Sequence, residues 1–131
     1  MSLRTLGMLQ WVGLLLGAGV WAAQHVVGSG LTQADCGAGG AGWEISNDLW
    51  QATLTACAAG LVLVAGASAI TVFVRTRDAG FGDEPAEEAG DVRRARMHFF
   101  AAASIAANTI FLMIILLDGV ASLYQAGCRQ S

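Results

Sequence analysis

The chain has 131 residues, of which 55% are hydrophobic and only 13% are charged, and its net charge is −3. Soluble domains carry about a quarter charged residues, so this chain lacks the polar residues that a water-soluble surface needs. The small negative net charge also argues against a nucleic-acid-binding surface, which requires a clustered basic face. The composition therefore indicates a protein that lies within a lipid bilayer.

Three long apolar stretches occupy about residues 6–27, 53–74 and 99–121. Each is close to the roughly 20 residues that an α-helix needs to cross the hydrocarbon of a bilayer. The sequence therefore predicts an all-α integral membrane protein with three transmembrane helices. We expect a single membrane domain over residues 1–131, with an outer loop at 28–50 and an inner loop at 75–97.

The first apolar stretch has an alternative interpretation as a secretory signal. Arg4 precedes the apolar run, and Val20, Trp21, Ala22 and Ala23 resemble a cleavage region. The apolar run is nevertheless longer than the roughly 7–15 residues of a signal core. This length favours a retained transmembrane helix.

The distribution of arginine predicts the orientation of the chain. The inner loop carries Arg75, Arg77, Arg93, Arg94 and Arg96, whereas residues 28–50 contain no basic residue. Because positively charged loops stay in the cytoplasm, we expect the N-terminus inside and the C-terminus outside. The abundance of Ala, Gly and Arg and the absence of Lys suggest a bacterial protein of the cytoplasmic (inner) membrane.

Small residues recur at helical spacing in all three predicted helices. Gly13 and Gly17 form a G-x-x-x-G pattern, Ala56 and Gly60 are four residues apart, and Asn108 lies near the middle of the third stretch. Small residues let helix backbones approach closely in lipid, and an intramembrane amide needs a partner on a neighbouring helix. We predict that these residues pack helices together, either within this chain or against a larger complex.

Two polar residues near the outer boundary are candidates for chemistry. Asp118 is the single acidic residue within a predicted span, and intramembrane carboxylates are functional candidates by default. It could form a structural bond with His25 at a similar depth, or it could handle protons. His98 lies near the opposite surface, about 30 Å from His25, so the two histidines cannot ligate one haem. We predict no catalytic, cofactor-binding or metal site.

The three cysteines differ in their predicted surroundings. Cys36 and Cys128 both fall on the outer side, where disulfides persist, so we predict a disulfide between the outer loop and the C-terminal segment. Cys57 lies about two turns into the second stretch and is expected to be a buried thiol.

The C-terminal part of the chain carries a resemblance to a known group of proteins. The run from Arg93 to Phe99 leads into a span with Asn108, Phe111 and Ile115; then follow Asp118, Gly119 and the terminal run Cys128, Arg129 and Gln130. This pattern resembles small multi-span membrane proteins associated with bacterial haem–copper cytochrome c oxidases. The resemblance covers at most residues 36–130, and Gly127 stands where that group has a proline. It implies an accessory subunit that holds no redox ligands.

Two functions remain open at this stage. The leading hypothesis is a non-catalytic accessory subunit of a bacterial respiratory membrane complex, a terminal cytochrome c oxidase by the resemblance. Its partners would be other integral membrane subunits and lipid. The alternative is a small homo-oligomeric transporter or channel that uses Asp118 and His25 as polar pathway residues. A membrane enzyme has the least support, because no nucleophile has a base at the same depth.

Overall fold

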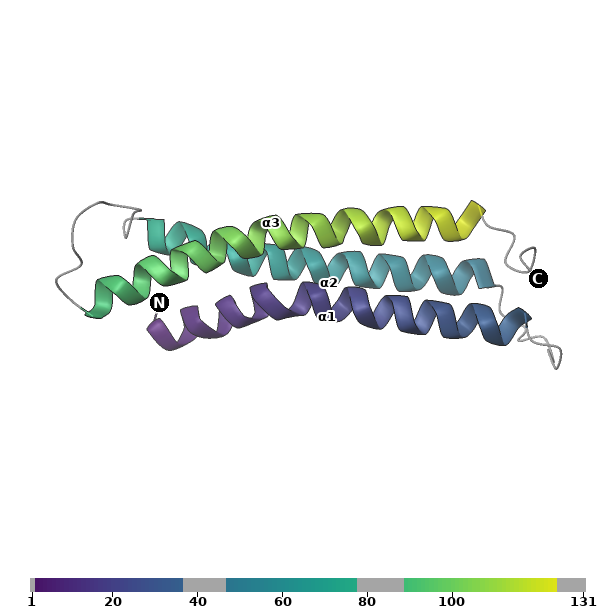
Figure 1. The fold of residues 1–131 in the computed structure, drawn as a ribbon, viewed down its shortest axis with the longest axis horizontal. Coiled ribbons are helices and arrows are strands. Elements are labelled where there is room, and N and C mark those ends of the chain that lie inside the picture. Colours follow the sequence, from purple (N-terminus) through teal and green to yellow (C-terminus); the bar gives the residue numbers. More distant parts are fainter. Residues whose placement is uncertain (1, 37–46, 78–88, 125–131) are drawn as a thin grey trace.

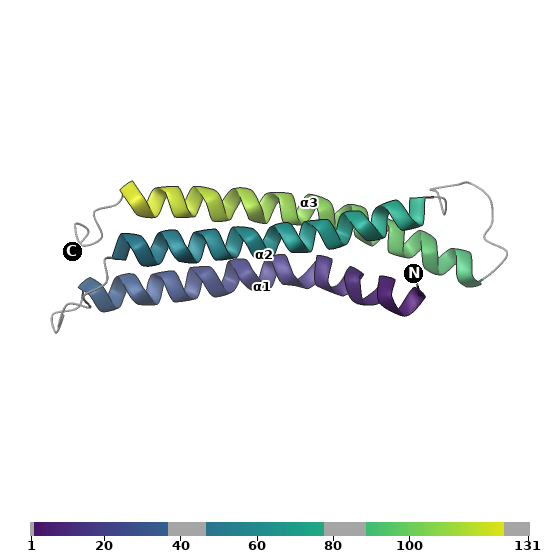
Figure 2. The same ribbon diagram turned by 180° about the vertical axis from the view of Figure 1, so that it is seen from behind.

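The fold is an elongated bundle of three long helices, given by a computed structural model that describes residues 2–36, 47–77 and 89–124. The helices are α1 (Leu3–Cys36), α2 (Asn47–Thr76) and α3 (Ala89–Tyr124). Each packs against the other two, α2 running antiparallel to its neighbours (Figure 1; Figure 2 shows the bundle from behind). The predicted all-α architecture with three helices is confirmed.

All three helices are long and apolar enough to cross a membrane. The candidate membrane spans are Leu3–Leu31, Asp48–Thr76 and Val92–Ser122, and an 18-residue segment within each has a mean hydropathy of 1.5, 2.3 and 2.3, respectively. Each candidate span is longer than the stretch predicted from the sequence, because less apolar residues such as Ser29 continue the helix beyond the apolar run. The chain is therefore a multi-pass membrane protein by the length and composition of its helices.

Local signals fix the helix ends. The hydroxyl of Ser2 accepts a hydrogen bond from the backbone N–H of Thr5 at 3.2 Å, which caps the start of α1. Asp48 lies in the first turn of α2 and Arg75 in its last turn. Both charges have the sign that the helix dipole favours at that end.

The interior follows a repeat of about 3.5 residues along each helix, as in coiled coils. On α2 the buried positions are Ala58, Val62, Ala65, Ser68, Ala69, Val72 and Thr76. On α3 they are Met97, His98, Ala101, Ser104, Asn108, Ile115 and Gly119. The alternating steps of four and three residues keep one narrow seam of each helix facing its neighbours.

Two apolar clusters are separated by a narrow region of small and polar residues. One cluster joins Leu6, Val72, Met97 and Ala101, and the other joins Ala58, Val62 and Ile115. The region between them, which we call the waist, consists of Gly13, Gly17, Ala69, Ser104 and Asn108. The waist brings residues of all three helices into contact.

The amide of Asn108 links α3 to α1 at the waist. Its Nδ2 donates to the backbone carbonyl of Gly13 at 2.7 Å and to that of Ser104 at 2.8 Å. A Cβ on Gly13 would lie 3.2 Å from the Cβ of Ala69, so glycine also brings α1 against α2. A Cβ on Gly17 would collide with Oδ1 of Asn108. The hydrogen of Gly17 that replaces this Cβ points at Oδ1, which has no conventional hydrogen-bond partner among the described residues.

The small residues predicted to pack α2 lie on the wrong side of the helix. Ala56 and Gly60 are exposed, and a Cβ added to Gly60 would meet open space. Their assignment to the packed interior of this bundle is therefore wrong, because the buried seam of α2 runs through Ala58 and Val62 on the opposite face. The expectation for Cys57 is also wrong, since this cysteine is exposed and free.

Charge is distributed unequally between the two ends of the bundle. Within the described ranges, the arginines all belong to the end that holds the start of α1, the end of α2 and the start of α3 (Figure 1). They are Arg4, Arg75, Arg77, Arg93, Arg94 and Arg96, and all six are exposed. The acidic side chains of Asp48 and Asp118 belong to the opposite end.

Replacing Gly17 by alanine tests the waist. We expect Gly17→Ala to lower the free energy of unfolding by about 1–3 kcal/mol, because the methyl group displaces the Asn108 amide from a packed interior. Unfolding can be followed by circular dichroism during titration with dodecyl sulfate in mixed micelles. Gly19→Ala is the matched control, because Gly19 is exposed on the same helix with open space around it. Equal effects of the two substitutions would contradict this account of the waist.

Candidate functional site

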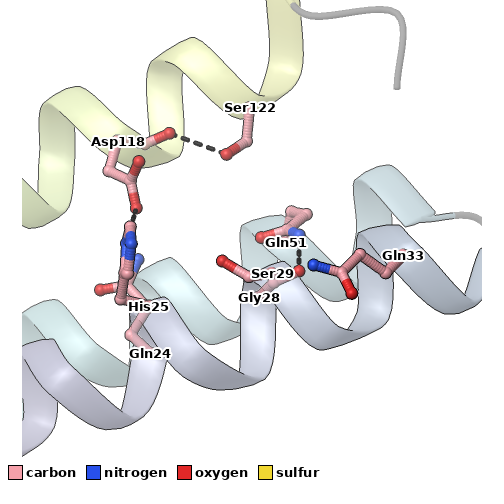
Figure 3. Close-up of a pocket in the computed structure, with 8 residues that line it drawn as sticks. All are labelled: Gln24, His25, Gly28, Ser29, Gln33, Gln51, Asp118 and Ser122. Atoms are coloured by element: carbon pink, nitrogen blue, oxygen red, sulfur yellow. Dashed lines mark hydrogen bonds and ion pairs between the residues drawn. The ribbon is translucent and has the colours of Figure 1, made fainter. Parts of the chain in front are cut away.

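A pocket lined by polar residues lies at the end of the bundle opposite the arginines (Figure 3). Its volume is about 270 Å³. The lining residues come from all three helices and are Gln24, His25, Gly28, Ser29, Gln33, Gln51, Asp118 and Ser122. We call it the polar pocket. It is the place where this mostly apolar molecule gathers hydrogen-bonding side chains.

His25 and Asp118 face each other across the polar pocket, as Figure 3 shows. Nδ1 of His25 lies 3.9 Å from Oδ2 of Asp118, and the two side chains are 62% and 46% exposed. The imidazole also stacks on Trp21, with 6.1 Å between ring centroids. Because both partners are well exposed, an ion pair between them contributes little to stability, and Asp118 remains accessible to other groups.

Gln24 is the buried member of the polar pocket. Its side chain is only 8% exposed, and its Nε2 donates to Oγ1 of Thr55 at 3.4 Å. Its Oε1 has no hydrogen-bond partner among the described residues. A buried acceptor of this kind is costly unless water or a ligand supplies a donor.

Glycines let the helices converge around the polar pocket. A Cβ on Gly119 would collide with the side chain of Thr55, so α3 approaches α2 more closely here than any other residue would allow. Nε2 of Gln51 donates to the backbone carbonyl of Gly28 at 3.2 Å and joins the start of α2 to α1. Ser122 donates to the backbone carbonyl of Asp118 at 2.8 Å. The lining of the polar pocket is thus held by contacts between all three helices.

A second polar contact lies at the arginine end of the bundle. His98 is 6% exposed, stacks on Phe73 at 4.3 Å between ring centroids, and has its Nδ1 3.1 Å from Oγ1 of Thr76. The Thr76 hydroxyl donates to the carbonyl of Val72 at 2.8 Å, so its oxygen accepts from an Nδ1–H of His98. This arrangement explains His98 as a satisfied interior residue that locks α3 to α2.

The structure brings together some of the residues singled out from the sequence and separates others. His25 and Asp118 share the polar pocket, and Gly13, Gly17 and Asn108 share the waist, whereas Ala56 and Gly60 face outward. The predicted disulfide lies outside the described residues, because Cys128 and the side chain of Cys36 are not described. The sequence did not single out Thr55, Gln51, Thr76 or Ser122 as partners of these residues.

The polar pocket presents mainly uncharged hydrogen-bonding groups. Its lining offers a carboxylate, an imidazole, amides and hydroxyls, and all but two of these groups carry no charge at any ordinary pH. Among the described residues, no three His, Cys, Asp or Glu side chains gather into a possible metal site. The hydroxyls of Ser68, Ser104 and Ser122 donate to backbone carbonyls of their own helices.

Comparisons with protein-family models, with curated proteins and with solved structures found no match. The class of protein therefore rests on the fold itself, which is a three-helix membrane bundle with a polar pocket at one end.

Replacing Thr76 by valine tests the contact between α2 and α3 at the arginine end. We expect Thr76→Val to lower the free energy of unfolding by about 1 kcal/mol, because the buried imidazole of His98 loses a hydrogen bond. Thr71→Val is the control, since Thr71 is exposed and bonds only to the carbonyl of Ala67 on its own helix. Chemical denaturation of the two variants in the same detergent compares them. No difference between the variants would show that the Thr76 contact contributes nothing.

Proposed function

We propose that this chain is a non-catalytic accessory subunit of a bacterial respiratory membrane complex, and that it acts by packing its helices against the core subunits. The observation that carries the proposal is the outward face of α2. Ala56 and Gly60 lie on that face, on the side of the helix away from the other two helices, with open space around Gly60.

Gly60 weakens α2 unless another helix covers it. Glycine costs a helix about 1 kcal/mol relative to alanine, and nothing within the described bundle offsets this cost. A small-residue face allows a second helix to approach closely, which is the main source of helix association in lipid. A transmembrane helix of a larger subunit is therefore the occupant that we propose for this face.

The proposal places the N-terminus and the α2–α3 connection in the cytoplasm. The six described arginines gather at that end of the bundle, and positively charged segments favour the cytoplasmic side of a bacterial inner membrane. The opposite end, with the polar pocket and the start of α2, would then face the outside. The C-terminus would lie outside as well.

The sequence resemblance selects the complex to test first. The chain resembles proteins associated with haem–copper cytochrome c oxidases in three features, which are the arginine run before α3, the intramembrane Asn108 and the Asp118–Gly119 pair. In the structure, Asn108 and Gly119 serve contacts between the helices of this chain. We therefore propose a terminal oxidase as the complex and a role in its assembly or stability.

A pull-down from the native membrane tests the proposal. The tagged chain is extracted in mild detergent and captured, and its companions are identified by mass spectrometry and by haem absorbance. We expect haem-containing oxidase subunits in a fixed ratio to the chain. Recovery of the chain alone, or only with copies of itself, would contradict the proposal.

Matched variants locate the contact surface. We expect Gly60→Leu to reduce co-purification at least several-fold, because the leucine fills the space that a partner helix would occupy. Gly7→Leu on α1 is the control and should have no such effect. A Cβ on Gly7 also meets open space, but the residues four positions away are Leu3 and Trp11, which do not form a small-residue face. Both variants should unfold like the parent protein in detergent, which separates loss of the partner from loss of the fold.

A homo-oligomeric transporter is the second candidate, and the polar pocket with His25 and Asp118 is the observation that favours it. The apolar cluster of Ala58, Val62 and Ile115 fills the interior between the pocket and the middle of the bundle. A polar path across the membrane would therefore have to run between copies of the chain. For this candidate we expect self-association of the purified chain and proton flux into vesicles that contain a trapped pH-sensitive dye. Asp118→Asn should abolish the flux and leave the association intact. Vesicles without flux would contradict a proton transporter.

A further inference from the structure

We propose that the polar pocket binds a primary ammonium group, supplied either by a small soluble amine or by the ethanolamine headgroup of a phospholipid. This inference does not depend on the accessory-subunit proposal. It rests on the charge of the polar pocket, on a buried acceptor without a partner, and on the position of the pocket along the bundle.

The charges around the polar pocket favour a cation. Among the described residues, the ionisable ones that line it are Asp118 and His25, and neither lysine nor arginine lines it. The arginines of the described segments are gathered at the far end of the bundle. The carboxylate of Asp118 faces the polar pocket, where it attracts a positive ligand and repels an anion.

Gln24 supplies the second observation that points to a ligand. Its side chain is more than nine-tenths buried, it lines the polar pocket, and its Oε1 lacks a hydrogen-bond donor among the described residues. The Nε2 of the same amide donates to Oγ1 of Thr55. A ligand that brings an N–H into the pocket would satisfy this oxygen.

A primary ammonium group has the donors that the polar pocket lacks. It carries three N–H donors and no acceptor. The acceptors around the pocket include Oε1 of Gln24, the carboxylate of Asp118 and the oxygen of Ser122, whose hydrogen is already donated to a backbone carbonyl. A divalent cation fits less well, because no three His, Cys, Asp or Glu side chains gather within the described segments.

The size and depth of the polar pocket suit both sources of the ammonium group. A volume of about 270 Å³ holds several groups the size of water, each of which takes about 30 Å³ in the liquid. Asp118 and Ser122 lie in the last turns of the candidate membrane span Val92–Ser122, so we place them near the boundary between hydrocarbon and lipid headgroups. Solutes from the water and headgroups of the surrounding lipid therefore reach the same place.

The first test measures soluble ligands on the full chain in phosphatidylcholine nanodiscs, whose quaternary headgroup has no N–H donor. Calorimetric titration compares n-propylammonium with tetramethylammonium and with the neutral n-propanol. We expect only n-propylammonium to bind with 1:1 stoichiometry. Equal binding of all three probes, or binding of none, would overturn the proposal.

Variants connect the binding to the polar pocket. We expect Asp118→Asn to weaken the affinity for n-propylammonium about ten-fold or more, because a charged acceptor is lost. Gln24→Leu should weaken the affinity as well. If this buried substitution disturbs the fold, the result for Asp118→Asn alone decides the test. Asp48→Asn is the control, because Asp48 is an exposed carboxylate that belongs to the same end but does not line the pocket. If Asp48→Asn and Asp118→Asn weaken the affinity for n-propylammonium equally, the amine is attracted only by the negative charge of the surface. That result would overturn the proposal.

The last measurement distinguishes the two sources. Part of the phosphatidylcholine is replaced by phosphatidylethanolamine, and the titration with n-propylammonium is repeated. Two results together support the lipid as the ligand. Phosphatidylethanolamine competes with n-propylammonium, and the lipid is retained on the parent protein in native mass spectrometry but lost from Asp118→Asn. An unchanged affinity for n-propylammonium supports a soluble amine. Either outcome supports an ammonium site, provided that the first test has shown selective binding.

Discussion

The contact between Asn108 and the two glycines of α1 determines how the rest of the bundle can form. In lipid, apolar side chains gain nothing by leaving one apolar medium for another, so helices associate through close packing and interhelical hydrogen bonds. Gly13 and Gly17 remove the side chains that would hold α3 away, and Asn108 then reaches the carbonyl of Gly13. Because Gly13 also meets Ala69, this one level sets the spacing of all three helices.

The two ends of the bundle use this spacing differently. Toward the arginine end, apolar side chains fill the interior, and His98 forms a hydrogen bond to α2 there. Toward the other end, Gln24 and Thr55 replace apolar contacts, and the interior opens into the polar pocket. A molecule with one closed end and one open end directs any binding chemistry to the open end.

The sequence predicted the three helices and the buried faces of α1 and α3, but it did not predict the buried face of α2. Gly13 and Gly17 on α1 and the amide of Asn108 on α3 indicate the packed sides of their helices, because small residues allow close approach and an amide needs a partner in lipid. The interior of α2 consists of alanines and valines, and alanine and glycine also occupy its outer side, so size and polarity do not distinguish the two faces. The partners of Gln24 and His98 could not be predicted either, because the periodicity of one helix does not fix its register against another.

The length of the helices has a consequence for the membrane around them. The candidate membrane spans contain 29, 29 and 31 residues, which correspond to about 44–47 Å of helix. This length is closer to the roughly 40–45 Å of a bilayer with its headgroups than to the ~30 Å of its hydrocarbon core. A bilayer that thins or thickens by a few ångströms therefore still meets regular helix at both of its surfaces, with no loop drawn into the hydrocarbon. The bundle can keep its internal geometry unchanged in membranes of different lipid composition.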